Sequence, residues 1–194
     1  MKRFINLVTL VLLTSCTSAP LSVNYYLLHT PTPIASEAIS KKTQIYFSSL
    51  SIADYLHQKS LVIQISQHEL HFSRQDLWAE DLKQSFYKAL KHDLNLSSGN
   101  QYGSTSPFSE NELILKVNLE HFNITNEASV ISSGTYRIQD NNKWLDKPFY
   151  VSAPLLKNGY PHAVTQLRST IETLAKQINA DINQYQQINT DNEP

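Results

Sequence analysis

A strict alternation of side chains in residues 113–119 limits the fold more than any other feature of the sequence. In the stretch LILKVNL the odd-numbered positions are all Leu or Val, and the even-numbered positions are Ile, Lys and Asn. Because successive side chains of a strand point to opposite faces, this pattern predicts a strand with one buried face. Residues 128–138 and 144–152 also have strand composition, and the turn residues Asp140, Asn141 and Asn142 lie between them. The three segments predict an antiparallel meander.

Shorter strand signals precede the meander. An apolar segment at residues 25–28 is expected to be extended, and residues 44–48 form a predicted strand. Residues 61–65 and 69–72 are expected to pair as a hairpin. Residues 30–42 contain two prolines among small and polar residues, which indicates a loop.

Two segments have helical periodicity. Ser73 and Asp76 are spaced as a capping pair, and apolar residues recur at helical spacing from Leu77 to Leu94. A second apolar face begins after Pro161 and continues to Tyr185. Its steps of three and four residues also fit a coiled coil, but we expect the helix to pack on the sheet. Two helices and about six strands predict a single-domain α+β sandwich with a largely antiparallel sheet.

The N-terminus has the features of an export signal. Lys2 and Arg3 precede the apolar residues 4–13, and small residues follow. The longest apolar run, Leu7 to Leu13, is too short to span a bilayer as a helix, which takes about 20 residues. We therefore expect residues 1–15 to be a signal peptide.

The sequence Leu13-Thr14-Ser15-Cys16 resembles the lipobox of bacterial lipoproteins. The resemblance implies that the chain is cut before Cys16 and that its sulfur carries diacylglycerol. An ordinary signal peptide with a chance cysteine is the alternative. Thr17 replaces the Asp that retains many lipoproteins in the inner membrane, so outer-membrane sorting is expected. The predicted layout is 1–15 signal peptide, 16–24 lipidated cysteine and tether, 25–186 domain and 187–194 disordered tail.

Composition and motifs argue against several functions. The net charge is −1, and no run of Lys or Arg forms a footprint for nucleic acid. His68 and His71 would point to opposite faces of a strand, which disfavours a metal site. Nucleophile elbows and phosphate-cradling glycine loops are missing from the sequence. We expect a protein that is not an enzyme and has no cofactor; a periplasmic hydrolase is a weaker hypothesis.

Several motifs together resemble a known family. They are NYYLL after the lipobox, IADYL at 52–56, LVIQIS in the hairpin, LWAEDL at 77–82, KPFY at 147–150 and NGY at 158–160. Their order and spacing resemble the ABC-type transport auxiliary lipoproteins of the PqiC family. Two positions depart from the family pattern: Ala53 stands where relatives often have Pro, and Leu77 where they often have Arg.

The resemblance implies an outer-membrane docking component of an MCE-type lipid transport system. Its partner would be an MCE-domain tunnel protein anchored in the inner membrane, and self-association is a further option. Aromatic residues are enriched at interfaces, so Tyr25, Tyr26, Tyr55 and Trp78 are candidate partner contacts, with core packing as the alternative for each. A lipoprotein that binds peptidoglycan or carbohydrate is the alternative function.

Overall fold

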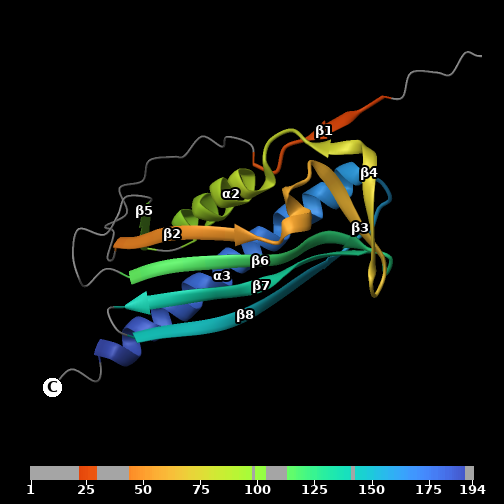
Figure 1. Ribbon diagram of the computed structural model, residues 1–194. Coiled ribbons are helices and arrows are strands. Elements are labelled where there is room, and N and C mark those ends of the chain that lie inside the picture. The colour runs from red at the N-terminus through yellow and green to blue at the C-terminus, as the bar shows by residue number, and fades with distance from the viewer. Residues whose placement is uncertain (1–21, 30–43, 98, 104–112, 141–142, 191–194) are drawn as a thin grey trace, which may run out of the picture.

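A computed structural model describes residues 22–29, 44–97, 99–103, 113–140 and 143–190. Within these residues, two α-helices lie on one side of a twisted eight-stranded sheet (Figure 1). The elements, in chain order, are β1 Asn24–Tyr26, β2 Gln44–Ile52, the 3-10 helix η1 Asp54–His57, β3 Ser60–Ser66, β4 Glu69–Trp78, α2 Leu82–Leu96, β5 Gln101–Gly103, β6 Leu113–Thr125, β7 Ser129–Asp140, β8 Lys143–Pro154 and α3 Tyr160–Thr190.

The described sheet is mixed, and its longest pairings are antiparallel, as expected. Its order is β1-β4-β3-β6-β2-β5, and β7 pairs with both β6 and β8. The pairs β3–β4, β6–β7 and β7–β8 are antiparallel. The pairs β1–β4, β2–β5, β2–β6 and β3–β6 are parallel. The predicted α+β class is confirmed, but the described sheet has two more strands than the six expected.

The predicted meander is confirmed as β6, β7 and β8. Its registers run from Ile114 opposite Gln139 to Asp140 opposite Lys143, with a bulge in β6 between Leu119 and His121. Gly134 lies opposite this bulge. A Cβ at Gly134 would collide with the backbone carbonyl of Asn118, so the close approach of the two strands requires glycine there.

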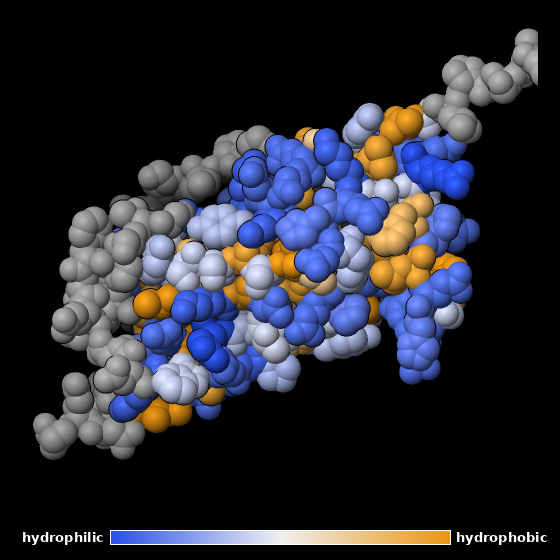
Figure 2. Space-filling view, viewed as in Figure 1, coloured by the Kyte–Doolittle hydropathy of each residue, from blue (hydrophilic) through white to orange (hydrophobic). Residues whose placement is uncertain are grey.

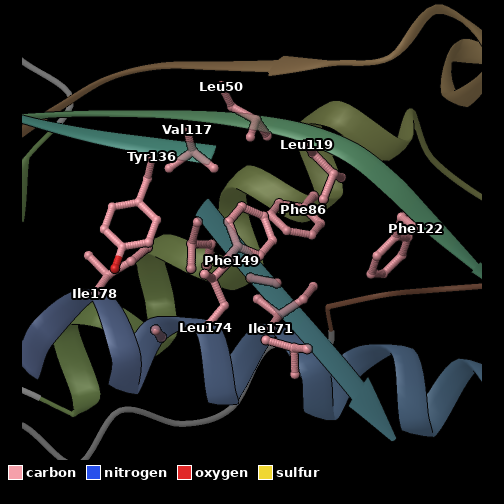
Figure 3. Close-up of a cluster of buried hydrophobic side chains, with 14 of the residues drawn as sticks. Leu50, Phe86, Val117, Leu119, Phe122, Tyr136, Phe149, Ile171, Leu174 and Ile178 are labelled. Atoms are coloured by element: carbon pink, nitrogen blue, oxygen red, sulfur yellow. The ribbon is translucent and has the colours of Figure 1, made fainter. Parts of the chain in front are cut away.

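The core lies between the sheet and the two helices. Figure 3 shows α3 directing Ile171, Leu174 and Ile178 toward side chains of the sheet, among them Val117 and Phe149. All three α3 side chains are fully buried. The last helix therefore packs on the sheet as expected, and its apolar face is not a coiled-coil seam.

The predicted start of the first helix is wrong. Residues 73–78 belong to β4, and α2 begins at Leu82, with the Asp81 carboxylate accepting a hydrogen bond from the backbone N–H of Gln84. The Ser73 hydroxyl does accept a hydrogen bond of 2.9 Å from the backbone N–H of Asp76. Both residues belong to strand β4, so this bond does not cap a helix. Leu77 and Trp78 fit the helical spacing only by chance.

Several predicted boundaries shift. Helix α3 extends to Thr190, so residues 187–190 are helical rather than part of a disordered tail, while 191–194 lie outside the described residues. Strand β1 already includes Asn24, the last residue of the predicted tether. The predicted loop at 30–42 lies outside the described residues.

Candidate functional site

The predicted lipidation site is outside the part of the chain that the structure describes. Leu13, Thr14, Ser15 and Cys16 all precede Ser22, where the description begins. The prediction of a lipid on Cys16 therefore rests on the sequence. What the structure describes is the segment that would lead from this anchor into the domain.

That segment is built into the sheet. Strand β1 pairs in parallel with the end of β4, and Asn24 and Tyr26 both turn toward Asp76. The Asn24 side-chain amide and the Tyr26 hydroxyl each donate a hydrogen bond of 3.0 Å to Asp76 Oδ1. Burial, this hydrogen bond to Asp76 and, to a smaller extent, the neighbouring Tyr160 raise the pKa of Tyr26 to about 12. Leu28 follows and is buried in the core, so the chain is fixed on both sides of Tyr26.

The four predicted interface aromatics have different environments. Trp78 is only 4% exposed, and its ring lies 6.1 Å from that of Phe122. Tyr26 is half-buried against Asp76. Tyr25 is exposed, and Tyr55 is half-buried with its hydroxyl donating to the Glu120 carbonyl at 3.1 Å. Tyr25, Tyr26 and Trp78 meet where β1 joins β4, whereas Tyr55 lies on η1. Core packing therefore accounts for Trp78, and the four residues do not form one surface.

Burial also sets the chemistry of Tyr55. Desolvation raises the pKa of its hydroxyl to about 12, so the group stays protonated at neutral pH. It acts as a hydrogen-bond donor that ties η1 to β6. This bond belongs to the IADYL motif, in which Ala53 precedes η1 in an extended conformation without a proline ring.

Sequence reasoning missed two exposed aromatic residues on β8. Trp144 and Tyr150 are exposed on the solvent side of this strand. Phe149 and Val151, on its opposite side, are buried. Their even-numbered positions in the predicted strand 144–152 were the available signal, because odd and even residues face opposite sides. Figure 2 shows that the face of the molecule in view is largely hydrophilic, with scattered apolar atoms.

An ion pair fixes the surroundings of Trp144. Arg137 on β7 binds Asp146 through two hydrogen bonds of 2.5 and 2.7 Å, and its guanidinium lies 5.8 Å from the Trp144 ring centroid. The hydrogen bond from Arg137 lowers the pKa of Asp146. A cation–π contact at such an exposed site contributes about 0.5–1 kcal/mol.

Polar side chains inside the domain connect its elements. Arg168 on α3 makes a double hydrogen bond with Asp93 on α2, at 2.5 and 2.6 Å. Tyr136 on β7 donates to Asp181 on α3, and Lys147 of β8 pairs with the same carboxylate at 2.6 Å. Among the described residues, no group of three or more His, Cys, Asp and Glu side chains is placed to hold a metal ion.

The sequence model of the ABC-type transport auxiliary lipoprotein component matches residues 26–179. The chain belongs to this family. The match runs from β1 to the middle of α3 and so includes the junction of β1 and β4, η1 and the meander. It confirms the family predicted from the sequence motifs.

Two curated relatives carry the same name. The chain is 23% identical to the intermembrane transport lipoprotein PqiC of Escherichia coli (strain K12) over 168 residues, which are 86% of this chain and 90% of that protein. The match to PqiC of Shigella flexneri has the same identity and coverage. These relatives are lipoproteins of intermembrane transport by name.

Solved structures share the fold. The crystal structure of an uncharacterized protein superposes with a TM-score of 0.71 at 21% identity, covering 83% of this chain and 99% of that one. A protein from Xanthomonas campestris superposes with a TM-score of 0.67 at 10% identity, covering 87% and 99%. At such identities the likeness establishes the fold alone.

Proposed function

We propose that this chain is an outer-membrane lipoprotein that serves as a non-catalytic docking adaptor of an MCE-type lipid transport system. Membership of a transport auxiliary lipoprotein family over residues 26–179 is the observation that carries the proposal. The curated relatives named for intermembrane transport support the same process. In this role the domain seats the far end of a periplasm-spanning tunnel protein that is anchored in the inner membrane.

The attachment of the domain fits an adaptor. From Cys16 to Asn24 the chain has eight residue steps, which span at most about 29 Å when fully extended. Beyond Asn24 the chain is paired in the sheet. Stable anchoring takes two or more acyl chains, which a modified Cys16 would supply. Thr17 after the cysteine supports sorting to the outer membrane. Among the described residues, neither helix is long and apolar enough to cross a bilayer.

The partner surface that we favour is the solvent side of β7 and β8. Trp144 and Tyr150 are both exposed there, and the Arg137 guanidinium lies 5.8 Å from the Trp144 ring centroid. Interface hot spots are enriched in Trp, Tyr and Arg. Tyr55 remains a second candidate, because it is only half-buried.

Capture by the partner tests this proposal. The mature lipidated chain in detergent is mixed with an immobilised MCE-domain protein from the same organism, and Trp144→Ala, Tyr150→Ala and Tyr55→Ala are compared with the parent. Loss of a hot spot costs about 2 kcal/mol or more in binding, roughly thirtyfold in affinity. Leu96→Ala is the matched control, because Leu96 is also exposed but lies at the end of α2.

The possible results test the adaptor role and the β7–β8 partner surface separately. Weaker capture by a variant that melts like the parent supports the β7–β8 surface. Parental capture by every folded variant would place the interface elsewhere. Failure of the parent itself to bind the MCE-domain protein, in detergent and in membranes, would contradict the adaptor role.

A carbohydrate-binding function is the second candidate. The exposed rings of Trp144 and Tyr150 stand among polar side chains on the open side of the sheet, an arrangement that suits sugar binding. Co-sedimentation with purified sacculi distinguishes the two functions. Binding to sacculi that Trp144→Ala abolishes, together with no capture by the MCE-domain protein, would favour this candidate.

A further inference from the structure

The segment that enters the domain exposes apolar side chains on its outer side. In residues 22–29 the side chains that face the domain include the polar Asn24 and Tyr26, which bind Asp76. The side chains at the alternate positions are apolar and exposed: Val23 by 43%, Tyr25 by 64% and Leu27 by 50%. A strand on the surface of a soluble domain normally shows the opposite pattern, with its polar side outward. We call Val23, Tyr25 and Leu27 the outer β1 face.

The outer β1 face is held in a fixed position. Strand β1 ends the strand order, and within the described sheet only β4 pairs with it. The backbone N–H of Ala79 donates to the Tyr26 carbonyl at 2.9 Å, and the buried side chain of Leu28 closes the segment. Tyr25 on the paired strand and its flanking residues Val23 and Leu27 thus expose three apolar side chains beside β4.

Other exposed apolar residues lie at the same end of the domain. Leu156 is 82% exposed and lies four residues before Tyr160, which neighbours Tyr26. The backbone N–H of Leu155 donates to the Ala128 carbonyl at 2.7 Å in the β6–β7 turn. The side chain of Asn126, in that turn, donates to the carbonyl of the exposed Ile65 on β3 at 3.2 Å.

These contacts gather most of the exposed apolar side chains at one end. Of the nine large hydrophobic side chains exposed in the described residues, five belong to it: Val23, Tyr25, Leu27, Ile65 and Leu156. Figure 1 shows β1, the β3–β4 hairpin and the start of α3 at one end, and the C-terminus at the other. Helix α3 has 31 residues, so the two ends are about 46 Å apart at 1.5 Å per residue.

The length of the predicted tether limits how far the outer β1 face can lie from a lipid on Cys16. Seven residue steps separate Cys16 from Val23, which limits their distance to about 25 Å. If Cys16 is acylated, as the proposed function requires, the bilayer surface is the apolar phase within reach. A surface held so close by covalent attachment needs little intrinsic affinity to stay in contact.

We propose that the outer β1 face, together with Leu156, is a membrane-contact surface that rests on the acyl-chain boundary of the bilayer that holds the anchor. Tyr25 suits such a position, because its ring has an apolar body and a polar tip. Lys157 follows Leu156 and is exposed, so its long side chain can reach the phosphate headgroups. Contact at this end directs the other end of α3 away from the membrane, toward an arriving partner.

A fluorescent probe tests the contact in the full lipidated chain. Tyr25→Cys is labelled with an environment-sensitive fluorophore; acylated Cys16 has no free thiol, and the chain has no other cysteine. The protein is placed in vesicles of phosphatidylethanolamine and phosphatidylglycerol. Tyr150→Cys is the matched control, because Tyr150 is an equally prominent tyrosine on the open side of the sheet.

We expect the emission at position 25 to shift to shorter wavelength in vesicles and to be quenched by brominated acyl chains. Interfacial apolar groups lie roughly 5–10 Å into the headgroup boundary, within reach of such quenchers. The probe at position 150 should show neither effect. Adding Val23→Ser and Leu27→Ser to the labelled protein should reduce the shift without changing its thermal melting, because both side chains are exposed.

Three other results would overturn the proposal. Equal emission at positions 25 and 150 would mean that the outer β1 face stays in water. A shift at position 25 that appears only when the MCE-domain protein is added would make the face a protein interface. Failure of the full chain to float with the vesicles would refute the lipid anchor, and with it the membrane contact.

Discussion

The Tyr26 hydroxyl donates a hydrogen bond of 3.0 Å to Asp76 Oδ1, which joins the segment leading to the tether to strand β4. Asp76 is only 6% exposed, and it also accepts bonds from Asn24 and Ser73. A carboxylate in this position depends on its donors, because an unpaired buried charge is costly. These hydrogen bonds therefore fix to the domain the segment that leads to the proposed anchor at Cys16.

Replacing Tyr26 by Phe tests this attachment. Tyr26→Phe removes one hydrogen bond to a charged group, so we expect a loss of about 1.5–3 kcal/mol in the free energy of unfolding. Urea unfolding measures the loss, and amide exchange of β1 shows whether that strand opens first. Tyr25→Phe is the control, since its ring is exposed. Equal free energies of unfolding for Tyr26→Phe and Tyr25→Phe would mean that the hydrogen bond from Tyr26 to Asp76 does not stabilise the fold.

The packing of α3 is tested at Leu174, which is fully buried against the sheet. Leu174→Ala should lower the free energy of unfolding by about 2–5 kcal/mol, and Leu174→Asp should lower it more, because a charge without a partner would enter the core. Lys176→Ala, on the exposed side of α3, should change it by less than about 0.5 kcal/mol. Unchanged melting of Leu174→Asp would show that the helix does not pack on the domain.

Stability should fall with acidification because of His29. Its ring centroid lies 5.1 Å from that of His92. Burial lowers the pKa of His29, the nearby His92, Arg168 and Lys88 lower it further, and Asp93 partly opposes them. The unfolded chain then binds more protons than the folded chain once the pH drops below about 6.5, so folding weakens from there toward the lowered pKa.

His29→Asn should remove this part of the pH dependence. Between pH 7 and pH 5 we expect the Tm of the parent protein to fall more than the Tm of the variant. His57→Asn, at an exposed histidine of η1, serves as the control and should follow the parent. Parallel curves for His29→Asn and the parent would contradict the assignment.

The lipid anchor is tested at Cys16. Cys16→Ser should abolish labelling by radioactive fatty acid and leave an uncleaved precursor, because the thioether requires the cysteine sulfur, and the chain contains one cysteine. Labelling of the variant equal to that of the parent would refute lipidation at this position.

Local patterns in the sequence predicted the elements whose partners are also local. The alternation at 113–119 and the turn residues predicted at 140–142 were sufficient for the β6–β7–β8 meander, because each strand pairs with the next one. The periodicity after Pro161 likewise located α3. The lipobox and the family motifs came from the sequence alone, and the family match confirmed the family.

Features that depend on distant contacts could not be read in the same way. The parallel pairing of β1 with β4 joins residues about fifty positions apart, so Asn24 and Tyr26 gave no sign of facing Asp76. Trp78 fits a helical pattern with Leu82, yet sheet pairing placed it in β4. Its burial against Phe122 is a tertiary contact that no local spacing encodes.

The central claim is that this lipoprotein docks a periplasm-spanning MCE partner at the outer membrane, and isolation of the membranes tests it most directly. Outer membranes are purified by density from cells that produce the tagged chain, and the tagged protein is captured from mild detergent. We predict that the parent is found in the outer-membrane fraction and carries the MCE-domain protein, whereas Cys16→Ser is absent from that fraction. Recovery of the parent in the inner membrane, or from the outer membrane without an MCE-domain protein, would contradict the account.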